Sequence, residues 1–469
     1  MLRVVLLDRL VQRLEGGTVL VPGSAGFDAA RLGFNSRFDA VVPQAIVYCA
    51  TAADIARTLA FTAGNGMEVA VRSGGHCFGG HSSSTGVVID VSPMTSVRLD
   101  GDVAAIGAGA RLGHVYAELD GPGRTIPGGT CPPVGIAGLT LGGGLGILGR
   151  QYGVTSDRLT AARVVLASGE ILDCDEHRHP DLFWALRGGG AGNFGVVTSL
   201  SLRTVPAPAG TWNGHLTWPE AAAGDVITAW QQWAPAAPGP VAASLKITTT
   251  GDPGTAASVD VYVTGFGPYA DARITDALIG QAGVLPVSVT GERGPFPAAR
   301  RFWAELGDHP DQPDSGPPAR PFLFSRSEFF TAPLPGEAIG ALLTAFTADR
   351  EPGVSRELDF MPWGGAYRNT SADATAFVHR DGLFQLKHSA VVGPPTSEER
   401  SSRAHRWVTR SWDSVHPWGS GHVFPNFADP DLQAPGECYY GHNLPRLKRI
   451  KRHYDPGNTF GSGQSIPLA

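Results

Sequence analysis

Two glycine-rich segments carry the side chains best suited to chemistry. Residues 72–83 read Arg-Ser-Gly-Gly-His-Cys-Phe-Gly-Gly-His-Ser-Ser and place His76 directly after a pair of glycines. Residues 128–144 contain Cys131 and a second run of glycines. Glycine lets a loop turn its backbone N–H groups toward a phosphate. Two such loops suit a long diphosphate cofactor better than a mononucleotide, with an imidazole and a thiol beside it.

Simpler interpretations of these residues stay open at this level. A histidine after two glycines commonly orders its own loop, and a lone cysteine is usually an inert small hydrophobe. The runs Gly144-x-Gly146-x-x-Gly149 and Gly190-x-Gly192-x-x-Gly195 also satisfy the dinucleotide fingerprint taken alone. That fingerprint needs a first strand, a following helix and an acidic residue about 20 positions on. Neither run has that context, so a Rossmann-type site is not favoured.

Short α+β units must position these loops. Residues 43–50 predict a buried strand, and Thr51 followed by Asp54 predicts the start of a helix that ends near residues 64–66. Three more strands and a second helix are predicted at residues 68–72, 86–91, 103–107 and 111–120. The first glycine-rich segment therefore directly follows a strand.

Length, charge and cysteine content limit the classes of partner and site that this chain can have. The chain has 469 residues, a net charge of −6 and no long basic run, which disfavours nucleic acid and anionic membrane as partners and favours a small molecule. No apolar run approaches the length of a spanning helix, and the apolar stretch after Met1 is too short for a signal peptide. We therefore expect a cytoplasmic protein, as a monomer or homodimer. Five cysteines without a Cys-x-x-Cys pair give no metal site.

A change in amino-acid composition along the chain suggests the domain organisation. The proline-rich stretch 205–208 is followed by a region rich in tryptophan and proline that runs to about residue 425. We expect one domain over residues 1–205, a second over residues 206–426, and a C-terminal return to the first over residues 427–469.

The sequence resembles the berberine bridge enzyme family, within the vanillyl-alcohol oxidase type of FAD fold, over nearly the whole chain. Besides the glycine-rich segments, the matching pieces are Arg150-Gln151-Tyr152-Gly153 with Asp157, residues 181–190, 193–197, 439–443, 454–456 and 464–467. The resemblance implies an α+β fold with an FAD-binding domain in two subdomains. It also implies an inserted substrate domain with an antiparallel sheet covered by helices.

By this resemblance FAD would be bonded at two points, with His76 on the flavin 8α-methyl and Cys131 on ring carbon C6. The glycines that would line the diphosphate are Gly74, Gly75, Gly135, Gly138 and Gly143. Further residues that would contact the cofactor are Arg72, Ser73, Cys77, Gly80, His81, Val134, Gly142, Gly146, Asp157, Asn193, Gly195, Val197, Asn426 and Gln464. The chain departs from the family at Gly461, where an arginine usually follows the phenylalanine. This departure affects the tail assignments and not the two anchors.

The base that would assist hydride transfer is harder to assign. Phe424 stands where sugar-oxidising relatives have a tyrosine, and it cannot accept a proton. The strand around Lys387 would put Gln385 and Lys387 on one face. A buried lysine can lose several pKa units and act as a base, or it can pair with Asp359 as a structural ion pair. Other candidates are Tyr152 and Tyr367 for catalysis, and Trp363 and His422 for the pocket.

The resemblance implies an FAD-dependent oxidase that takes a hydride from an alcohol, hemiacetal or amine carbon of a small molecule. Val134 favours O₂ as the acceptor, because relatives with a small residue there leave space for O₂ beside the flavin. We expect a secondary metabolite as substrate. A carbohydrate oxidase is the main alternative, and a non-redox cyclase or isomerase that keeps the flavin is another.

Overall fold

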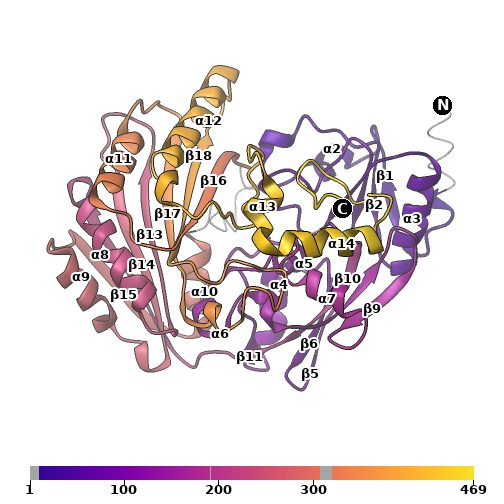
Figure 1. Cartoon of the computed structure of the whole chain (residues 1–469), viewed down its shortest axis with the longest axis horizontal. Helices are drawn as coiled ribbons and strands as arrows, with labels where there is room; N and C mark the ends of the chain where they lie inside the picture. The colour runs from indigo at the N-terminus through magenta and orange to yellow at the C-terminus, as the bar shows by residue number, and fades with distance from the viewer. Residues whose placement is uncertain (1–9, 191, 307–319, 469) are drawn as a thin grey trace.

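The computed structural model describes residues 10–190, 192–306 and 320–468. Two lobes lie side by side (Figure 1). The first lobe, at the right of Figure 1, carries the N-terminal strands and helices together with the C-terminal helices. The second lobe, at the left, carries strands and helices that lie between them in the chain. Each lobe has its own large buried core.

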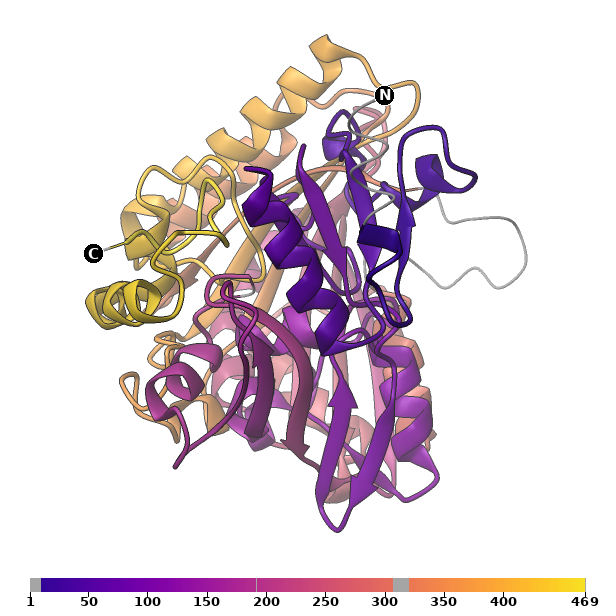
Figure 2. The ribbon, with the colours of Figure 1, turned by 90° about the vertical axis from the view of Figure 1, so that its right-hand side faces the viewer.

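The first lobe begins with a four-stranded sheet in the order β1-β2-β4-β3. Its strands are β1 (Thr18–Leu20), β2 (Ala45–Tyr48), β3 (Val69–Arg72) and β4 (Val87–Asp90). The helix α3 (Ala52–Gly64) starts at a capping box in which Thr51 accepts from the N–H of Asp54, and the Asp54 carboxylate accepts from the N–H of Thr51. The strands and the helix start predicted from the sequence are confirmed here. In Figure 2 the indigo helix α3 lies in front of this lobe, with the yellow C-terminal segment beside it.

A second, antiparallel sheet completes the first lobe, in the order β5-β6-β10-β8-β9. Its strands are β5 (Val97–Asp100), β6 (Val103–Gly107), β8 (Leu159–Val165), β9 (Ile171–Asp175) and β10 (Val196–Arg203). The helices of this region are α4 (Leu112–Asp120), α5 (Ile136–Leu141), α6 (Gly149–Tyr152) and α7 (Pro180–Leu186). The second glycine-rich segment leads into α5, and the C-terminal helices α13 (Pro435–Tyr440) and α14 (Leu444–Tyr454) join the same buried core.

The second lobe is a seven-stranded antiparallel sheet in the order β15-β12-β14-β13-β17-β18-β16. Its strands are β12 (Thr211–Pro219), β13 (Val241–Thr249), β14 (Ser258–Phe266), β15 (Ser288–Gly294), β16 (Phe322–Phe330), β17 (Val354–Pro362) and β18 (Phe384–Val392). Its longer helices are α8 (Ala223–Ala236), α9 (Asp276–Ala282), α10 (Phe296–Ala304), α11 (Gly336–Thr347) and α12 (Glu398–Asp413). The expected α+β fold with a helix-covered antiparallel sheet is confirmed, whereas the exact boundaries at 205 and 426 stay predictions.

Strand alternation gives this sheet two different faces. Leu245, Phe360 and Leu386 point into the core beneath the covering helices. On the opposite face Lys246 lies directly across from Asp359, and Asp359 directly across from Lys387. Opposite charges on neighbouring strands attract each other, so this register is favourable. The polar face is turned toward the first lobe.

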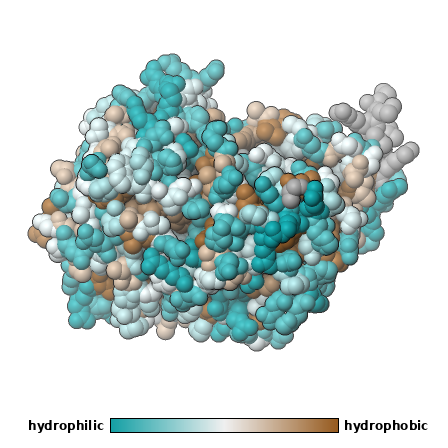
Figure 3. All heavy atoms as spheres, in the orientation of Figure 1, coloured by the Kyte–Doolittle hydropathy of each residue, from teal (hydrophilic) through white to brown (hydrophobic). Residues whose placement is uncertain are grey.

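The outer surface is ordinary for a globular chain. On the face in Figure 3, apolar residues are scattered among hydrophilic ones. Within the described ranges no helix has both the length and the apolar character needed to cross a bilayer.

Candidate active site

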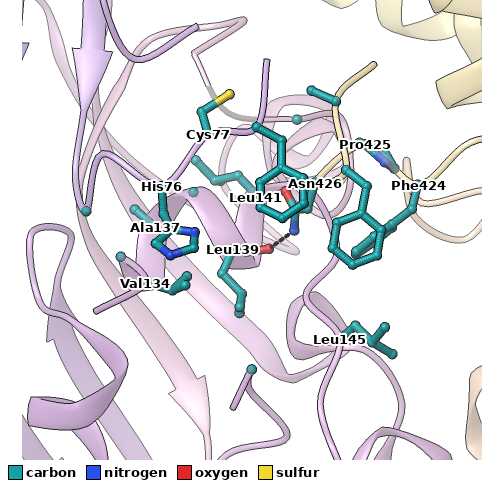
Figure 4. Close-up of a pocket in the computed structure, with 18 of the residues that line it drawn as sticks. His76, Cys77, Val134, Ala137, Leu139, Leu141, Leu145, Phe424, Pro425 and Asn426 are labelled. Atoms are coloured by element: carbon teal, nitrogen blue, oxygen red, sulfur yellow. Dashed lines mark hydrogen bonds between the residues drawn. The ribbon is translucent and has the colours of Figure 1, made fainter. Parts of the chain in front are cut away.

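A cavity of about 450 Å³ lies between the two lobes. Both glycine-rich segments line it from the first lobe, and the polar face of the seven-stranded sheet lines it from the second. His76 and Cys131, which are 55 positions apart in the sequence, share this cavity. In Figure 4, His76 and Val134 lie on one side of the space, and Leu145 and Phe424 on the other.

The two glycine-rich segments touch each other backbone to backbone. A Cβ added at Gly74 would lie 2.3 Å from the backbone N of Gly135, and one at Gly135 would lie 2.3 Å from Ser73 Oγ. Only glycine permits this approach. By contrast, a Cβ at Gly138 would meet nothing within 4 Å, although Gly138 lines the cavity. The contact holds the His76 and Cys131 loops together and leaves an open cradle beside them.

Most residues predicted to hold the cofactor line this one cavity. They are Ser73, Gly74, Gly75, His76, Cys77, His81, Cys131, Val134, Gly135, Gly138, Gly146, Asn193, Gly195, Val197, Asn426 and Gln464. The Asn426 side chain donates a hydrogen bond to the carbonyl of Leu139 at 2.8 Å, which ties the returning segment to α5 (Figure 4). An elongated cofactor therefore fits the residues that are present, with an imidazole and a thiol both facing it.

Two charged residues that were predicted to contact the cofactor do not line the cavity, and each forms an ion pair within the protein instead. Arg72 forms a buried ion pair with Asp90 at 2.6 Å and so joins β3 to β4. Asp157 accepts two hydrogen bonds of 2.8 Å from the guanidinium of Arg380. Both charges are neutralised inside the fold, because a buried charge without a partner is costly.

Three glycines of the predicted set also pack against protein and do not line the cavity. A Cβ at Gly142 would meet the side chain of Asn426, and one at Gly143 would meet the ring of Phe377. Gly80 lies under another phenyl ring in the same way. These glycines allow neighbouring side chains to pack closely. A glycine-rich motif alone does not show whether a given glycine does this or contacts a ligand.

Four charged side chains form a cluster on the cavity side of the sheet. Glu357 lies between two ammonium groups, 2.8 Å from Lys246 Nζ and 3.3 Å from Lys387 Nζ. Lys387 is also 3.7 Å from Asp359, whose other oxygen accepts a 2.7 Å hydrogen bond from Ser244. Lys246, Asp359 and Lys387 line the cavity. Sequence reasoning missed Lys246 and Glu357, although the alternation of β13 and β17 places both on the polar face.

This cluster argues against Lys387 as a neutral base. Two carboxylates beside an ammonium group favour its charged form. Burial raises the pKa of Glu357, but the charges of Lys246 and Lys387 outweigh burial and lower that pKa to about 2. The alternative in which Lys387 pairs with Asp359 describes the observed geometry, with Glu357 as a second and closer partner.

The tyrosine candidates differ in position. Tyr367 lines the cavity, but burial raises the pKa of its phenol well above the ordinary value, and the charge of Arg150 opposes this only in part. Tyr367 is therefore a hydrogen-bond donor at neutral pH. Tyr152 does not line the cavity and packs against a small apolar cluster with Ile147 and Leu148.

Three further candidates sit behind the cavity wall. Gln385 is fully buried and shares the polar face with Lys387, where its amide donates to Ser327 at 3.4 Å. Trp363 stacks on the ring of Tyr367 with centroids 4.2 Å apart, so it supports that ring from behind. His422 lies beside His379 rather than on the wall, whereas Phe424 does line the cavity.

Within the residues that the structure describes, no group of three or more His, Cys, Asp or Glu side chains is arranged to hold a metal ion.

Comparison with known proteins agrees with the geometry. The family described as FAD binding domain matches residues 43–175, and the family described as berberine and berberine like matches residues 423–467. The FAD-linked oxidoreductase YvdP of Bacillus subtilis is 32% identical over 96% of this chain and 98% of its own length. The chitooligosaccharide oxidase of Gibberella zeae is 30% identical over 90% of this chain and 87% of its own.

A solved structure agrees as well. The berberine bridge enzyme-like protein 1 of Physcomitrella patens superposes with a TM-score of 0.88 at 25% identity, and the match covers 99% of both chains. The chain belongs to the berberine bridge enzyme-like family of FAD-linked oxidoreductases.

Proposed function

We propose that this enzyme is an FAD-dependent oxidase that removes a hydride from an alcohol, hemiacetal or amine carbon of a small molecule and passes the electrons to O₂. The observation that carries the proposal is the shared cavity. It brings His76 and Cys131 to one wall and the charged cluster of the sheet to the other. A flavin ring held at the first wall would face a substrate held at the second.

His76 and Cys131 would hold the FAD through covalent bonds. Bound FAD supplies the hydride acceptor. Two bonds prevent loss of the cofactor and fix the ring, so that the wall opposite can stay open for a substrate. The small side chain of Val134 lies on the same wall as His76 and supports the assignment of O₂ as the final acceptor.

Asp359 is the group placed to take the substrate proton. Among the described residues it is the one carboxylate on the cavity wall. Its oxygens receive one hydrogen bond from Ser244 and one ion pair from Lys387, which leaves acceptor capacity for a substrate O–H or N–H. A positioned base of this kind contributes about 10²–10⁴ in rate.

The two lysines have a different task. Lys246 and Lys387 present ammonium groups to the same part of the cavity, and Glu357 holds both from behind. A fixed positive charge stabilises the negative charge that develops on the substrate oxygen as its proton leaves. The lysines orient the substrate, while Asp359 accepts the proton.

The remaining wall on this side is mainly apolar. It includes Leu145, Ile147, Trp303, Met361 and Phe427. Apolar and aromatic walls with a few convergent polar groups suit a compact organic molecule such as a secondary metabolite. The relative named chitooligosaccharide oxidase favours a carbohydrate as the second candidate.

Anaerobic mixing with a panel of aryl alcohols, cyclic amines and oligosaccharides tests the proposal. An oxidase substrate bleaches the flavin absorbance, and admitting air restores the absorbance with release of H₂O₂. Product formed with an unbleached spectrum would instead indicate a non-redox reaction. Bleaching that air does not reverse would refute O₂ as the acceptor.

A further inference from the structure

We propose that Phe34 and Asn35 are positioning residues that present His76 for covalent attachment of the flavin, and that they do so by docking on β16 of the second lobe. This inference rests on the proposed function, because it assumes the bond at His76. It adds a requirement for attachment that lies in neither glycine-rich segment.

Phe34 fixes the imidazole ring. Its phenyl ring stacks on His76 with centroids 3.8 Å apart and planes inclined by 24°. Its backbone N–H also donates to the carbonyl of Gly75 at 2.9 Å, one residue before His76. Phe34 is buried and belongs to a small cluster with Phe78 and Leu323. One residue therefore orients both the ring of His76 and the backbone that carries it.

Asn35 connects this loop to the second lobe. Its amide donates to the carbonyl of Phe78 at 3.2 Å and to the carbonyl of Leu323 at 3.0 Å. Its side-chain oxygen accepts from the N–H of Leu323 at 3.0 Å. The Asn35 side chain thus bonds to both the N–H and the carbonyl of Leu323, in the edge strand β16 of the seven-stranded sheet. It also bonds to Phe78, two residues after His76.

The neighbouring residues continue this docking along the edge. Ser36 donates through its N–H to the carbonyl of Pro321 at 2.8 Å. Asp39 forms an ion pair with Arg320, which in turn donates to the carbonyl of Gly33 at 3.0 Å. The segment from Gly33 to Asp39 is therefore held between β16 and the His76 loop. The orientation of His76 depends on assembly of both lobes.

The attachment step explains why orientation matters. Attachment would join a ring nitrogen of His76 to the flavin 8α carbon, with one hydrogen lost from each. The two electrons and two protons would first reduce the flavin ring and would then pass to O₂, which would become H₂O₂. A displacement of about 1 Å can slow such an oriented reaction by about 10². Loss of the stacking or of the Asn35 bridge should therefore slow bond formation without emptying the cavity.

The variants Phe34→Leu and Asn35→Ala test the inference. Phe34→Leu removes the stacked ring but keeps an apolar side chain. It therefore still tests the inference if Asn35→Ala does not fold. Asn443→Ala is the matched control. Asn443 is as buried as Asn35, at 4% exposure, and its amide bridges separate segments by donating to the carbonyls of Ala372 and Thr375.

The readout is peptide mapping of denatured protein, before and after incubation with excess FAD. We expect His76 occupancy to form about tenfold or more slowly in Phe34→Leu and Asn35→Ala. Flavin bonded at Cys131 should persist in both, and Asn443→Ala should match the wild type. Equal His76 occupancy in all proteins, or equal loss in Asn443→Ala, would overturn the inference. A wild type without flavin on His76 would instead overturn the proposed attachment itself.

Discussion

The substitution Glu357→Gln should strongly destabilise the second lobe, although it removes only one charge. The carboxylate of Glu357 lies between Lys246 and Lys387, at 2.8 and 3.3 Å, and its side chain is 16% exposed. The neutral amide would leave two ammonium groups with Asp359 as the one nearby carboxylate of the cluster. Breaking a buried ion pair by removing one partner costs about 3–5 kcal/mol.

The expected loss can be converted to temperature. For a lobe of this size, 1 kcal/mol corresponds to about 2–4 °C in Tm. The substitution should therefore lower the Tm of the second lobe by about 6–20 °C. Differential scanning at one fixed scan rate measures this shift, with the flavin absorbance followed in parallel to show that the first lobe keeps its cofactor.

Two further variants separate an uncompensated charge from general disruption. Asp173→Asn breaks an exposed ion pair with Arg163, which solvent screens, and should cost at most about 1 kcal/mol. The double variant Lys246→Met/Glu357→Gln removes one charge of each sign and should recover part of the loss. The reasoning would be refuted if Glu357→Gln were as mild as Asp173→Asn, or if the double variant were no more stable than the single one.

Three other outcomes follow from the site and the core. Gly74→Ala or Gly135→Ala should force the two glycine-rich segments apart, cost about 1–3 kcal/mol or more, and lower the ratio of flavin to protein absorbance. Asp359→Asn should slow flavin reduction by an identified substrate by about 10²–10⁴ in stopped-flow mixing, with flavin content unchanged. Burial lowers the pKa of His379 and of His388 to about 3, against about 6.5 in the unfolded chain. The unfolded state binds more protons between these values, so stability is full above pH 6.5 and falls toward pH 3, by about 1.4 kcal/mol per pH unit for each imidazole. Urea midpoints across that range should show a shallower fall in His388→Asn.

Local patterns allowed the N-terminal strands and helices of the first lobe to be predicted. The Thr51–Asp54 capping box lies within four residues, and it marks the start of α3 without reference to the rest of the fold. The strand before the His76 loop is likewise signalled by its own apolar residues. Features set by neighbours in the sequence can be predicted from the sequence, because the relevant energies are local.

The charged cluster could not be predicted in full, because it depends on strand register. Lys246 and Glu357 are 111 positions apart and meet because β13 pairs with β17. That register is determined by packing of the whole sheet beneath its helices. Strand alternation and burial indicate Lys387 as a candidate base, yet the two carboxylates that pair with it come from another strand, β17.

Some residues of the cofactor-binding motifs do not line the cavity. Arg72 stands in the same motif as His76 but is the last residue of β3 and pairs with Asp90 inside the fold. Gly142 and Gly143 are small because Asn426 and Phe377 pack on them. A motif preserves both the residues that touch a ligand and those that shape the loop, and only the three-dimensional packing separates the two groups.

Mapping of the flavin-bearing peptides tests the central claim most directly. Protein that is precipitated with acid and digested should remain yellow, and one flavin should join the peptide of His76 to the peptide of Cys131. The joined species should disappear in His76→Ala and in Cys131→Ser. Colourless precipitate, with all pigment in the supernatant and both peptides at their unmodified masses, would contradict the account.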